Sequence, residues 1–312
     1  HNAFEKFNGF FSIVCFNSKR KTLTLARDRL GQKPLYYCNN GKSVFFGSTE
    51  NLIPINFLGN TRKESFLDFI VYGFIPSPNT MFENLFSVNP GSYVEFSLSQ
   101  YKTKIIDKFQ YWKPVISNEV NDLDSAVENI SDSISSSIQE GMDASIDVAC
   151  LFSGGVDSSL ILSNARNVNE EICAFTADFG ENDDAEYRSR TLARTLSHKN
   201  HLIRNISRDD VNDSLRITSK ICESPFDDTS VIPSHIVFSS VKNSGYSVAL
   251  TGDGADELFC GYSSFGNLKK MEILLDKKFD LLRKYPGNFF KTVLSKYSKH
   301  DIDRFFMNET EL

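Results

Sequence analysis

D-V-A-C-L-F-S-G-G-V-D-S-S, residues 147–159, places an apolar run, a glycine pair and a polar helix start next to one another. The run Val148–Phe152 predicts a short buried strand, and Asp157–Ser159 predicts the start of a helix. The adjacent Gly154 and Gly155 let the backbone turn sharply and approach a ligand, because no Cβ intrudes. The helix N-terminus beyond them offers unpaired N–H groups and a partial positive charge. Strand, turn and helix start therefore predict an anion cradle, whose usual occupant is phosphate.

This turn differs from the common phosphate-binding patterns. It lacks the lysine of G-x-x-x-x-G-K-[ST] and the spacing of G-x-G-x-x-G. The letters S-G-G also occur in ordinary strand-to-helix turns that carry a serine cap. Taken alone, residues 153–158 leave the structural and the ligand-binding interpretation evenly balanced.

A second motif, L-T-G-D-G-A-D-E-L-F-C-G-Y at 250–262, changes that balance. Residues 247–250 predict another strand, and the turn after it combines glycines with acids. Mg²⁺ prefers one or two carboxylates together with phosphate oxygens and water. In open α/β sheets, ligands lie outside the carboxyl ends of the strands. By itself this motif would predict a solvated acidic turn, but the pair of motifs predicts a nucleotide and metal site.

Together the two motifs resemble the synthetase domain of glutamine-dependent asparagine synthetases of the bacterial AsnB type, over about residues 122–262. The S-G-G-V-D-S letters are similar to the pyrophosphate loop of enzymes that cleave ATP between the α and β phosphates. The segment E-S-P-F-D-D-T-S-V-I-P-S (223–234) is similar to the one that precedes the family's third sheet motif. The resemblance implies an α/β doubly wound parallel-sheet ATP-pyrophosphatase domain, of the adenine nucleotide α-hydrolase-like kind.

The resemblance also implies roles for individual residues. The pyrophosphate part of ATP would be held by Ser153, Gly154, Gly155, Ser158 and Ser159, the nucleoside by Leu151, Ala177, Thr251 and Gly252, and Mg²⁺ by Asp157 and Asp256. Asp253 stands where the family usually has an acid near the reacting centre. Cys260 departs from the family's commoner G-G-Y or A-G-Y, and we expect this change to affect packing only.

The N-terminal region predicts an antiparallel sheet. Residues 7–16 read as a strand, and the N-N-G turn at 39–41 predicts a hairpin. A-R-D-R-L-G-Q-K-P-L-Y-Y (26–37) and the following F-x-S-x-E (46–50) resemble the back half of a class II glutamine amidotransferase domain, an α+β fold. We expect Arg27 and Asp28 to form a structural ion pair.

That family's nucleophile is a cysteine at the mature N-terminus, with its own α-amine as base. The present sequence begins with His1, and its first cysteine, Cys15, falls inside a predicted strand. The resemblance therefore predicts a fragment without glutaminase activity. It also predicts a missing C-terminal part, because the family's charge-balancing lysine has no match here.

Two domains are expected: 1–117, a partial amidotransferase domain with a linker, and 118–312, an incomplete synthetase-type domain. Residues 111–114 and 117–122 are the predicted linker. Predicted helices and strands are listed here by residue number: helices at 64–74, 123–138 (capped by Asn121 or Asp122), 192–196, 211–222, 232–241 and after 262; strands at 89–96, 172–177, 201–206 and 247–250; and an acidic loop at 181–186. Alternating strands and helices predict a parallel sheet with right-handed crossovers.

Composition narrows the class of protein. The 312 residues carry a net charge of −6, which argues against a nucleic-acid partner. No apolar run approaches the roughly 20 residues of a membrane span, and no signal peptide is visible. The six cysteines show no C-x-x-C, so reduced and mostly buried thiols in a cytoplasmic protein are expected. The five histidines lack the spacing of zinc ligands.

The resemblance implies an ATP-dependent, amide-forming ligase. Aspartate would attack the α-phosphate of ATP to give β-aspartyl-AMP and pyrophosphate, and ammonia from glutamine would then displace AMP. Two alternatives remain open: the same fold amidating another carboxylate, such as a sugar uronate, a peptide or a β-lactam precursor, or a non-catalytic nucleotide-binding remnant. ATP and Mg²⁺ are the expected cofactors. The carboxylate, a homodimer and the role of the last fifty or so residues are left open.

Overall fold

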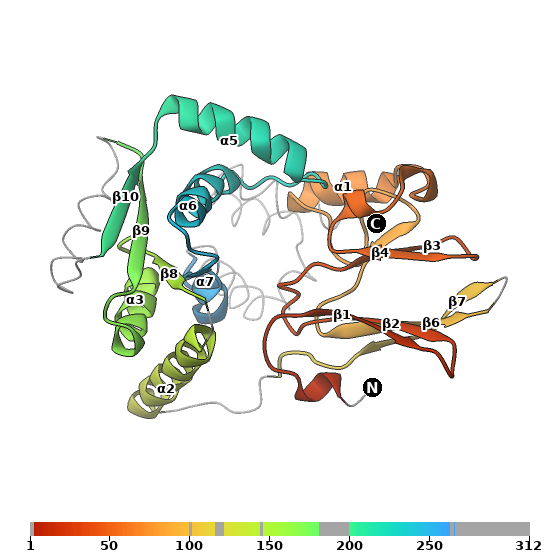
Figure 1. Ribbon diagram of the computed structural model, residues 1–312, viewed down its shortest axis with the longest axis horizontal. Coiled ribbons are helices and arrows are strands. Elements are labelled where there is room, and N and C mark those ends of the chain that lie inside the picture. The colour runs from red at the N-terminus through yellow and green to blue at the C-terminus, as the bar shows by residue number, and fades with distance from the viewer. Residues whose placement is uncertain are drawn as a thin grey trace, which may run out of the picture. The chain divides into compact units, whose positions relative to one another are not determined.

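The computed structural model describes residues 3–99, 102–115, 122–143, 146–180, 200–262 and 265. Their contacts divide them into two compact units, whose elements are labelled in Figure 1. The first unit holds the described residues up to 115 and, from much later in the sequence, residues 220–228. The second unit holds the described residues of 122–219 and 229–265.

Two antiparallel sheets form the first unit. Its strands are β1 (Ser12–Asn17), β2 (Thr22–Arg27), β3 (Tyr36–Asn39), β4 (Val44–Gly47), β5 (Leu85–Ser87), β6 (Ser92–Leu98) and β7 (Thr103–Gln110), and its helices are the short 3-10 turns η1 (Phe4–Lys6), η2 (Glu50–Leu52) and η3 (Ile55–Phe57) and the helix α1 (Lys63–Tyr72). One sheet has the order β1-β2-β6-β7 and the other the order β4-β3-β5. The predicted hairpin is confirmed, because β3 and β4 pair antiparallel across the N-N-G turn.

The core of the first unit lies between these sheets. Leu25 of β2, Tyr37 of β3 and Phe96 of β6 belong to one buried cluster. Cys38, the next residue along β3, belongs to a second cluster with Ile53 and Leu85. This alternation follows from the two-residue period of a strand, which sends neighbouring side chains to opposite faces.

Several boundaries in the first unit differ from the sequence-based expectation. The first strand begins at Ser12 rather than near residue 7, and β7 was not predicted. Helix α1 is confirmed, and it ends where Gly73 adopts a left-handed φ of 77°. Tyr111 is not part of a linker. Its side chain is 8% exposed, and its hydroxyl donates to the carbonyl of Arg27 at 2.5 Å.

The expected ion pair between Arg27 and Asp28 is wrong. The Arg27 guanidinium donates to the carbonyl oxygens of Lys33, Val88 and Gly31, at 2.9, 2.9 and 2.5 Å. The Asp28 carboxylate accepts the N–H groups of Gln32 and Lys33, at 3.0 and 2.9 Å. Both side chains fold the loop after β2, because a buried loop must supply partners for its own backbone groups.

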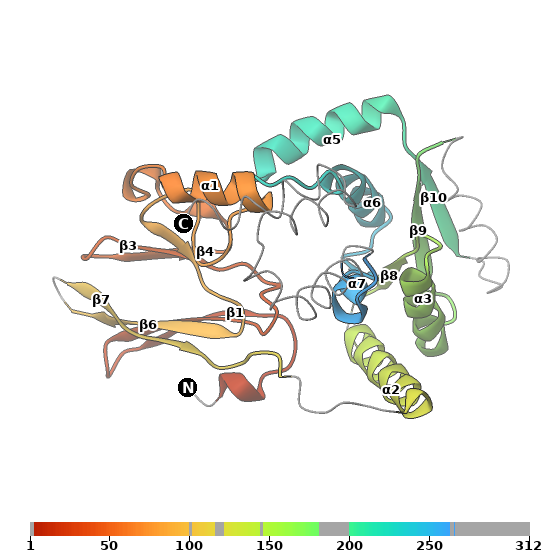
Figure 2. The same cartoon turned by 180° about the vertical axis from the view of Figure 1, so that it is seen from behind.

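The second unit is a parallel sheet with helices on both faces, as predicted. Its elements are α2 (Leu123–Met142), β8 (Val148–Leu151), α3 (Val156–Val168), β9 (Cys173–Asp178), β10 (His201–Asn205), α5 (Arg208–Ile221), α6 (Val231–Asn243), β11 (Val248–Leu250) and α7 (Ala255–Phe259). The strand order is β10-β9-β8-β11, and every neighbouring pair is parallel. Figure 2 shows the same elements from behind.

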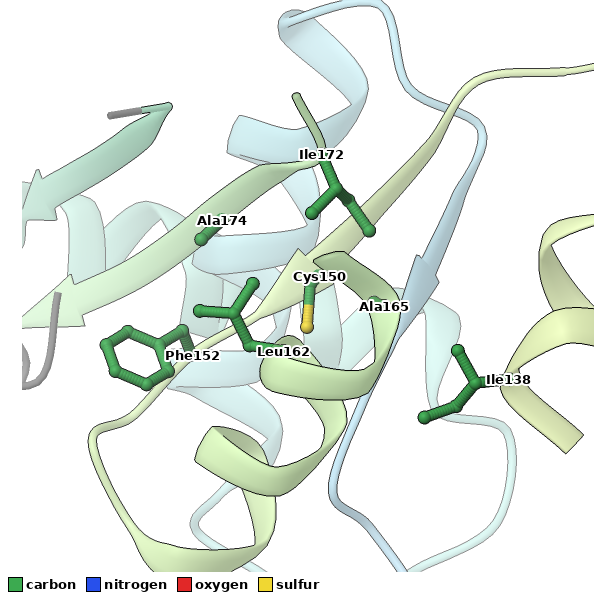
Figure 3. Close-up of a cluster of buried hydrophobic side chains, with 7 residues drawn as sticks. All are labelled: Ile138, Cys150, Phe152, Leu162, Ala165, Ile172 and Ala174. Atoms are coloured by element: carbon green, nitrogen blue, oxygen red, sulfur yellow. The ribbon is translucent and has the colours of Figure 1, made fainter. Parts of the chain in front are cut away.

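Alternate strand residues fill a core on each face of this sheet. Figure 3 shows one cluster, in which Cys150, Phe152 and Ala174 of the sheet side meet Leu162 of α3 and Ile138 of α2. On the other face, strand residues that include Ala149 and Phe175 pack against Val237 and Val241 of α6. Burial of a side chain such as Leu162 stabilises the fold by about 1.5–3 kcal/mol. The doubly wound arrangement therefore follows from two opposite apolar faces on each strand.

Helix α2 begins as expected. Asp122 is its cap, and its carboxylate accepts the N–H of Ser125 at 2.9 Å. Of the predicted apolar stripe, Ile138 is buried and Ile134 packs against the same cluster, whereas Leu123 is exposed. The helix therefore packs in the second unit through its C-terminal half.

Other expectations have mixed outcomes. Cys38, Cys150 and Cys173 are buried, but Cys15 and Cys260 are exposed and Cys222 is intermediate, so burial holds for only half of the cysteines. The predicted acidic loop at 181–186, the helix at 192–196 and the helices after 262 lie outside the described residues. Among the described helices, none is long and apolar enough to cross a membrane.

Candidate nucleotide site at the carboxyl edge of the parallel sheet

The strand order of the second unit reverses between β8 and β11. Strand β8 comes first in the chain, β9 and β10 follow on one side of it, and β11 returns to its other side. At such a switch point the loops leaving the two central strands run in opposite directions and open a crevice for ligands. The turns after β8 and β11 are the two sequence motifs. The expectation that a parallel sheet would bring them to neighbouring carboxyl ends is confirmed.

The turn after β8 has the backbone that an anion cradle requires. Gly154 has a φ of 78°, in the left-handed region that glycine adopts without steric cost. Gly155 is the N-cap of α3, and no side chain caps this end of the helix. The N–H groups of the first turn of α3 therefore point out of the helix without an intrahelical acceptor. A helix of this length also contributes a partial positive charge there.

Ser158 organises this turn from inside. Its side chain is only 8% exposed. Its Oγ accepts the N–H of Ser153 at 3.2 Å and lies 3.0 Å from the Oγ of Ser153 and 3.2 Å from the carbonyl oxygen of Gly155. The Oγ of Ser159 donates to the same carbonyl at 2.6 Å. Both hydroxyl groups, for which the resemblance implies pyrophosphate contacts, thus bond to the turn itself, and their contact with a ligand stays a prediction.

The turn after β11 is held more loosely. Its internal contacts are long: the N–H of Asp253 lies 3.4 Å from the Oγ1 of Thr251, and the N–H of Ala255 lies 3.3 Å from the carbonyl oxygen of Gly252. Asp253 is exposed. Gly254 has a φ of 92° and starts the short helix α7. This turn contributes acidic groups rather than a closed cradle.

The two turns meet at Gly252. A Cβ on this residue would lie 3.1 Å from the Cβ of Asp157 and 3.1 Å from the backbone nitrogen of Ser158. Such distances are tighter than ordinary carbon contacts, so the second turn packs directly on the start of α3. Glycine at 252 is needed for this close approach, and the nucleoside contact that the resemblance implies for it stays a prediction.

The end of α7 corrects the expectation for Cys260. This residue is exposed, with φ 56° and ψ 40°, a left-handed conformation that costs an L-residue about 1–2 kcal/mol. The effect of a cysteine here lies in the backbone and not in packing. At the next position, a Cβ on Gly261 would fall 1.8 Å from the Oδ1 of Asp256, so glycine leaves room for that carboxylate.

The donors present fit a magnesium ion that is shared with phosphate. Asp157 is in the first turn of α3 and Asp256 in the first turn of α7, each just past a glycine-rich turn. Mg²⁺ is usually held by one or two carboxylates, with phosphate and water filling the other positions. Among the described residues no group of three or more acidic, histidine or cysteine side chains could hold a metal alone. The chemistry of this donor set therefore suits a metal that arrives with a phosphate ligand.

The predicted nucleoside contacts lie at or near the carboxyl ends of β8, β9 and β11. Leu151 ends β8, and Ala177 is near the end of β9. Both pack on the α6 face of the sheet. Thr251 directly follows β11, and its Oγ1 faces the N–H of Asp253.

Thr176 and His201 support the cradle, and no sequence signal marked them. The Oγ1 of Thr176 donates to the carbonyl oxygen of Phe152, the residue before the turn. The Nε2 of His201 lies 2.7 Å from the same Oγ1, so the imidazole donates this bond once the hydroxyl proton is used. The His201 ring also stands edge-on to Phe152, with centroids 5.6 Å apart. A threonine within a strand and a histidine at the start of another form no sequence motif that would have predicted this role.

Comparison with known proteins identifies two family matches. The family described as "Asparagine synthase" matches residues 129–309, and the one described as "Glutamine amidotransferase domain" matches residues 1–112. A "Putative asparagine synthetase [glutamine-hydrolyzing] 2" of Methanocaldococcus jannaschii is 28% identical over 299 residues, covering 94% of this chain and 55% of the relative. "Asparagine synthetase [glutamine-hydrolyzing] 1" of Bacillus subtilis is 30% identical over 276 residues, covering 84% and 41%.

The chain thus spans about half the length of the curated relatives that it matches. Among solved structures, a glutamine-dependent NAD⁺ synthetase from Acinetobacter baumannii aligns with 58% of this chain and 32% of its own. The identity is 17% and the TM-score 0.34, which is too low to support an inference.

Proposed function

Because the chain belongs to the asparagine synthase family, we propose that its second unit binds ATP in the crevice between β8 and β11 and uses it to activate a carboxylate for amide formation. One observation carries this proposal. Gly252 of the second turn packs against Asp157 and Ser158 of the first, so the glycine turn and the acidic turn lie together at the carboxyl end of the sheet. The function requires both in one place.

In this proposal the chain's own groups position ATP. The backbone N–H groups at Gly155 and in the first turn of α3 bind phosphate oxygens, while Ser158 keeps the turn in shape. Asp157 and Asp256 would hold Mg²⁺, which would neutralise phosphate charge when bound. Without a cation, these carboxylates would repel a polyanion. Leu151, Ala177 and Thr251 border the nucleoside.

The proposed reaction has two steps. An oxygen of the substrate carboxylate bonds to the α-phosphorus of ATP, the bond to the bridging oxygen breaks, and pyrophosphate leaves. Ammonia then attacks the activated carbonyl carbon, AMP leaves, and the nitrogen loses a proton to give the amide. Aspartate is the proposed substrate, through β-aspartyl-AMP, and Asp253 is the proposed acid beside the reacting centre. The protein supplies orientation and charge stabilisation, which account for most of such a rate enhancement.

The first unit suggests the nitrogen source. Its match to a glutamine amidotransferase domain supports glutamine as the donor of the ammonia that the second unit consumes. Glutamine and a small carboxylate are thus the proposed small-molecule partners, and the ligase activity is that of the whole protein.

Titration calorimetry of ATP with Mg²⁺ tests nucleotide binding. Gly155→Val should abolish binding, because its side chain would fill the space proposed for phosphate. The turn itself has room for the added Cβ, which would lie 3.4 Å from the Oγ of Ser153. Gly141→Ala is the control, since Gly141, like Gly155, has no left-handed φ and its Cβ would make only an ordinary 3.6 Å contact with Leu250. Equal ATP affinity in wild type and Gly155→Val would refute the site.

Exchange of pyrophosphate into ATP, measured with a panel of carboxylates in the full-length protein, tests activation. Aspartate-dependent exchange supports asparagine synthesis, and exchange with another acid identifies that acid as the substrate. Asp157→Asn or Asp256→Asn should reduce exchange by about 10²-fold, the scale of losing one preorganised electrostatic group. Parental rates and parental Mg²⁺ dependence in both variants would show that the two acids merely cap their helices.

A further inference from the structure

A buried carboxylic acid in the first unit has no role in the proposed reaction. Glu50 opens η2 and is only 4% exposed. Acidic side chains are almost never this buried unless a partner compensates their charge. The residues that surround Glu50 come in part from 220–228, the segment that joins the first unit from between α5 and α6 in the sequence.

Glu50 and this segment bond to each other in both directions. The Glu223 carboxylate accepts two backbone N–H groups, that of Glu50 at Oε2 and that of Asn51 at Oε1, the latter at 3.2 Å. In return, the Ser224 hydroxyl donates to the Oε1 of Glu50 at 2.7 Å. The segment is anchored again further along, where the N–H of Asp227 donates to the carbonyl of Gly73 at 2.6 Å.

The second oxygen of Glu50 has no such partner. Its Oε2 is buried and makes no hydrogen bond to the described residues. The charged and titratable groups that face it are Glu223 from the docked segment and Tyr36 from β3. Tyr36 also interacts electrostatically with Arg27 of β2, whose N–H groups are already bonded to carbonyl oxygens.

The two carboxyl groups therefore have different environments. Glu223 uses both of its carboxylate oxygens to accept backbone N–H groups. An ionised Glu50 would place a second negative charge beside it, in a desolvated position and with one oxygen unpaired. Burial first, and then the charge of Glu223, raise the pKa of Glu50 above its ordinary value of 4.5, and the bond from Ser224 offsets this only in part.

We propose that Glu50 is a neutral carboxylic acid whenever residues 220–228 are docked on the first unit, where Glu223 and Ser224 hold the segment against it. Docking of the segment then takes up one proton, and release of the segment gives it back. The pair acts as a proton-linked latch on a segment whose two ends lead into α5 and α6 of the nucleotide-binding sheet. This latch uses residues other than those of the proposed ATP site, so the two proposals are tested independently of each other.

The direction of the pH effect follows from the raised pKa. Below 4.5 Glu50 is protonated in both states, so its own contribution to docking is fully present. As the pH rises from 4.5 to the raised pKa of the docked state, the released state loses its proton first, so docking weakens. The equilibrium constant for release should increase by up to about tenfold per pH unit in that window and level off above it.

Hydrogen–deuterium exchange of the full chain, corrected for intrinsic exchange at each pH, measures this release. The probes are the peptides that contain the amides of Glu50 and Asn51 and the segment 220–228. In wild type their protection should fall as the pH rises. In Glu50→Gln, which keeps an acceptor for Ser224 but cannot ionise, protection should stay high and independent of pH. Glu83→Gln, an exposed acid of the same unit, should behave as wild type.

An infrared measurement gives a second readout. The difference spectrum between wild type and Glu50→Gln should contain the carbonyl band of one protonated carboxylic acid at a pH where exposed glutamates are ionised. The proposal is overturned if wild type and Glu50→Gln show the same pH dependence of exchange, or if the band is missing. If Glu50→Gln fails to fold, titration of the band in wild type decides. If the band of a protonated carboxylic acid is absent at pH values above the range in which glutamates ordinarily titrate, a neutral Glu50 is refuted.

Discussion

The two glycine-rich turns of the second unit occupy neighbouring strand ends but are held in different ways. The turn after β8 is closed on itself, because Ser158 and Ser159 both reach back to the carbonyl of Gly155. The turn after β11 has only long internal contacts, and its place is fixed by Gly252 against the start of α3. The shape of the first turn is therefore set by its own hydrogen bonds, whereas the second turn depends on the first for its position.

The largest effect is expected where the second turn rests on the first. Gly252→Ala adds a Cβ 3.1 Å from Asp157 and from the Ser158 nitrogen, so the turns must separate. We expect ATP affinity to fall by about 10–100-fold, because overpacking at a tight contact costs about 1–3 kcal/mol. Calorimetric titration measures it. The control is Gly141→Ala, whose Cβ would make an ordinary 3.6 Å contact with Leu250. If the two variants bind ATP alike, the second turn does not depend on this contact.

A smaller effect is expected from backbone strain inside the first turn. Gly154→Ala forces an L-residue to φ 78° and should lower the free energy of unfolding by about 1–2 kcal/mol. Gly245→Ala, at φ 93° with open space around it, should cost a similar amount. Only Gly154→Ala should also weaken ATP binding, because only that glycine shapes the cradle. Denaturant unfolding and calorimetry together separate the two. A loss of ATP affinity in both variants would mean that general destabilisation is the cause.

The closure of the first turn depends on Ser158 more than on Ser159. Ser158→Ala removes a buried hydroxyl and leaves the Ser153 N–H without its acceptor, which should cost about 1–3 kcal/mol. Ser159→Ala removes an exposed bond to the same carbonyl and should cost about 0.5 kcal/mol. Urea unfolding of the two variants compares them directly. Equal losses would show that the turn is not organised around Ser158.

The smallest effect is expected at the end of α7, and it has the opposite sign. Cys260→Gly should stabilise the protein by about 0.5–1 kcal/mol, since relief of the left-handed conformation exceeds the entropy cost of glycine. Cys260→Ala keeps the Cβ and should leave the stability unchanged. Both are measured by denaturant unfolding under reducing conditions. A gain in Cys260→Ala would assign the effect to the thiol instead of the backbone.

Local patterns in the sequence were read correctly where neighbouring residues decide the structure. Strand, glycine turn and helix follow one another in 147–159, and their order depends on contacts within a few residues. The N-N-G hairpin and the Asp122 cap are local in the same sense. Alternation of strands and helices also predicted the parallel sheet, because a parallel connection needs a crossover.

The prediction of an ion pair from two adjacent charged residues was wrong where backbone groups bound both side chains. Arg27 and Asp28 suggested an ion pair, yet a loop with many unsatisfied carbonyl and N–H groups took up both side chains. Similarly, the resemblance implied pyrophosphate contacts for Ser158 and Ser159, and in the folded turn both hydroxyl groups also bond to the carbonyl of Gly155. Which partner a polar side chain selects depends on the groups that folding brings within reach.

The amino-acid sequence was enough to predict the two motifs, the family, and a strand, glycine turn and helix at 147–159. The contact of Gly252 with Asp157 and the shared site of Glu50 and Glu223 are visible only in the folded structure. The physical reason is separation along the chain. Partners some hundred or more residues apart leave no periodicity or spacing to read, because their contact is set by how sheets and helices pack and not by local conformational preference.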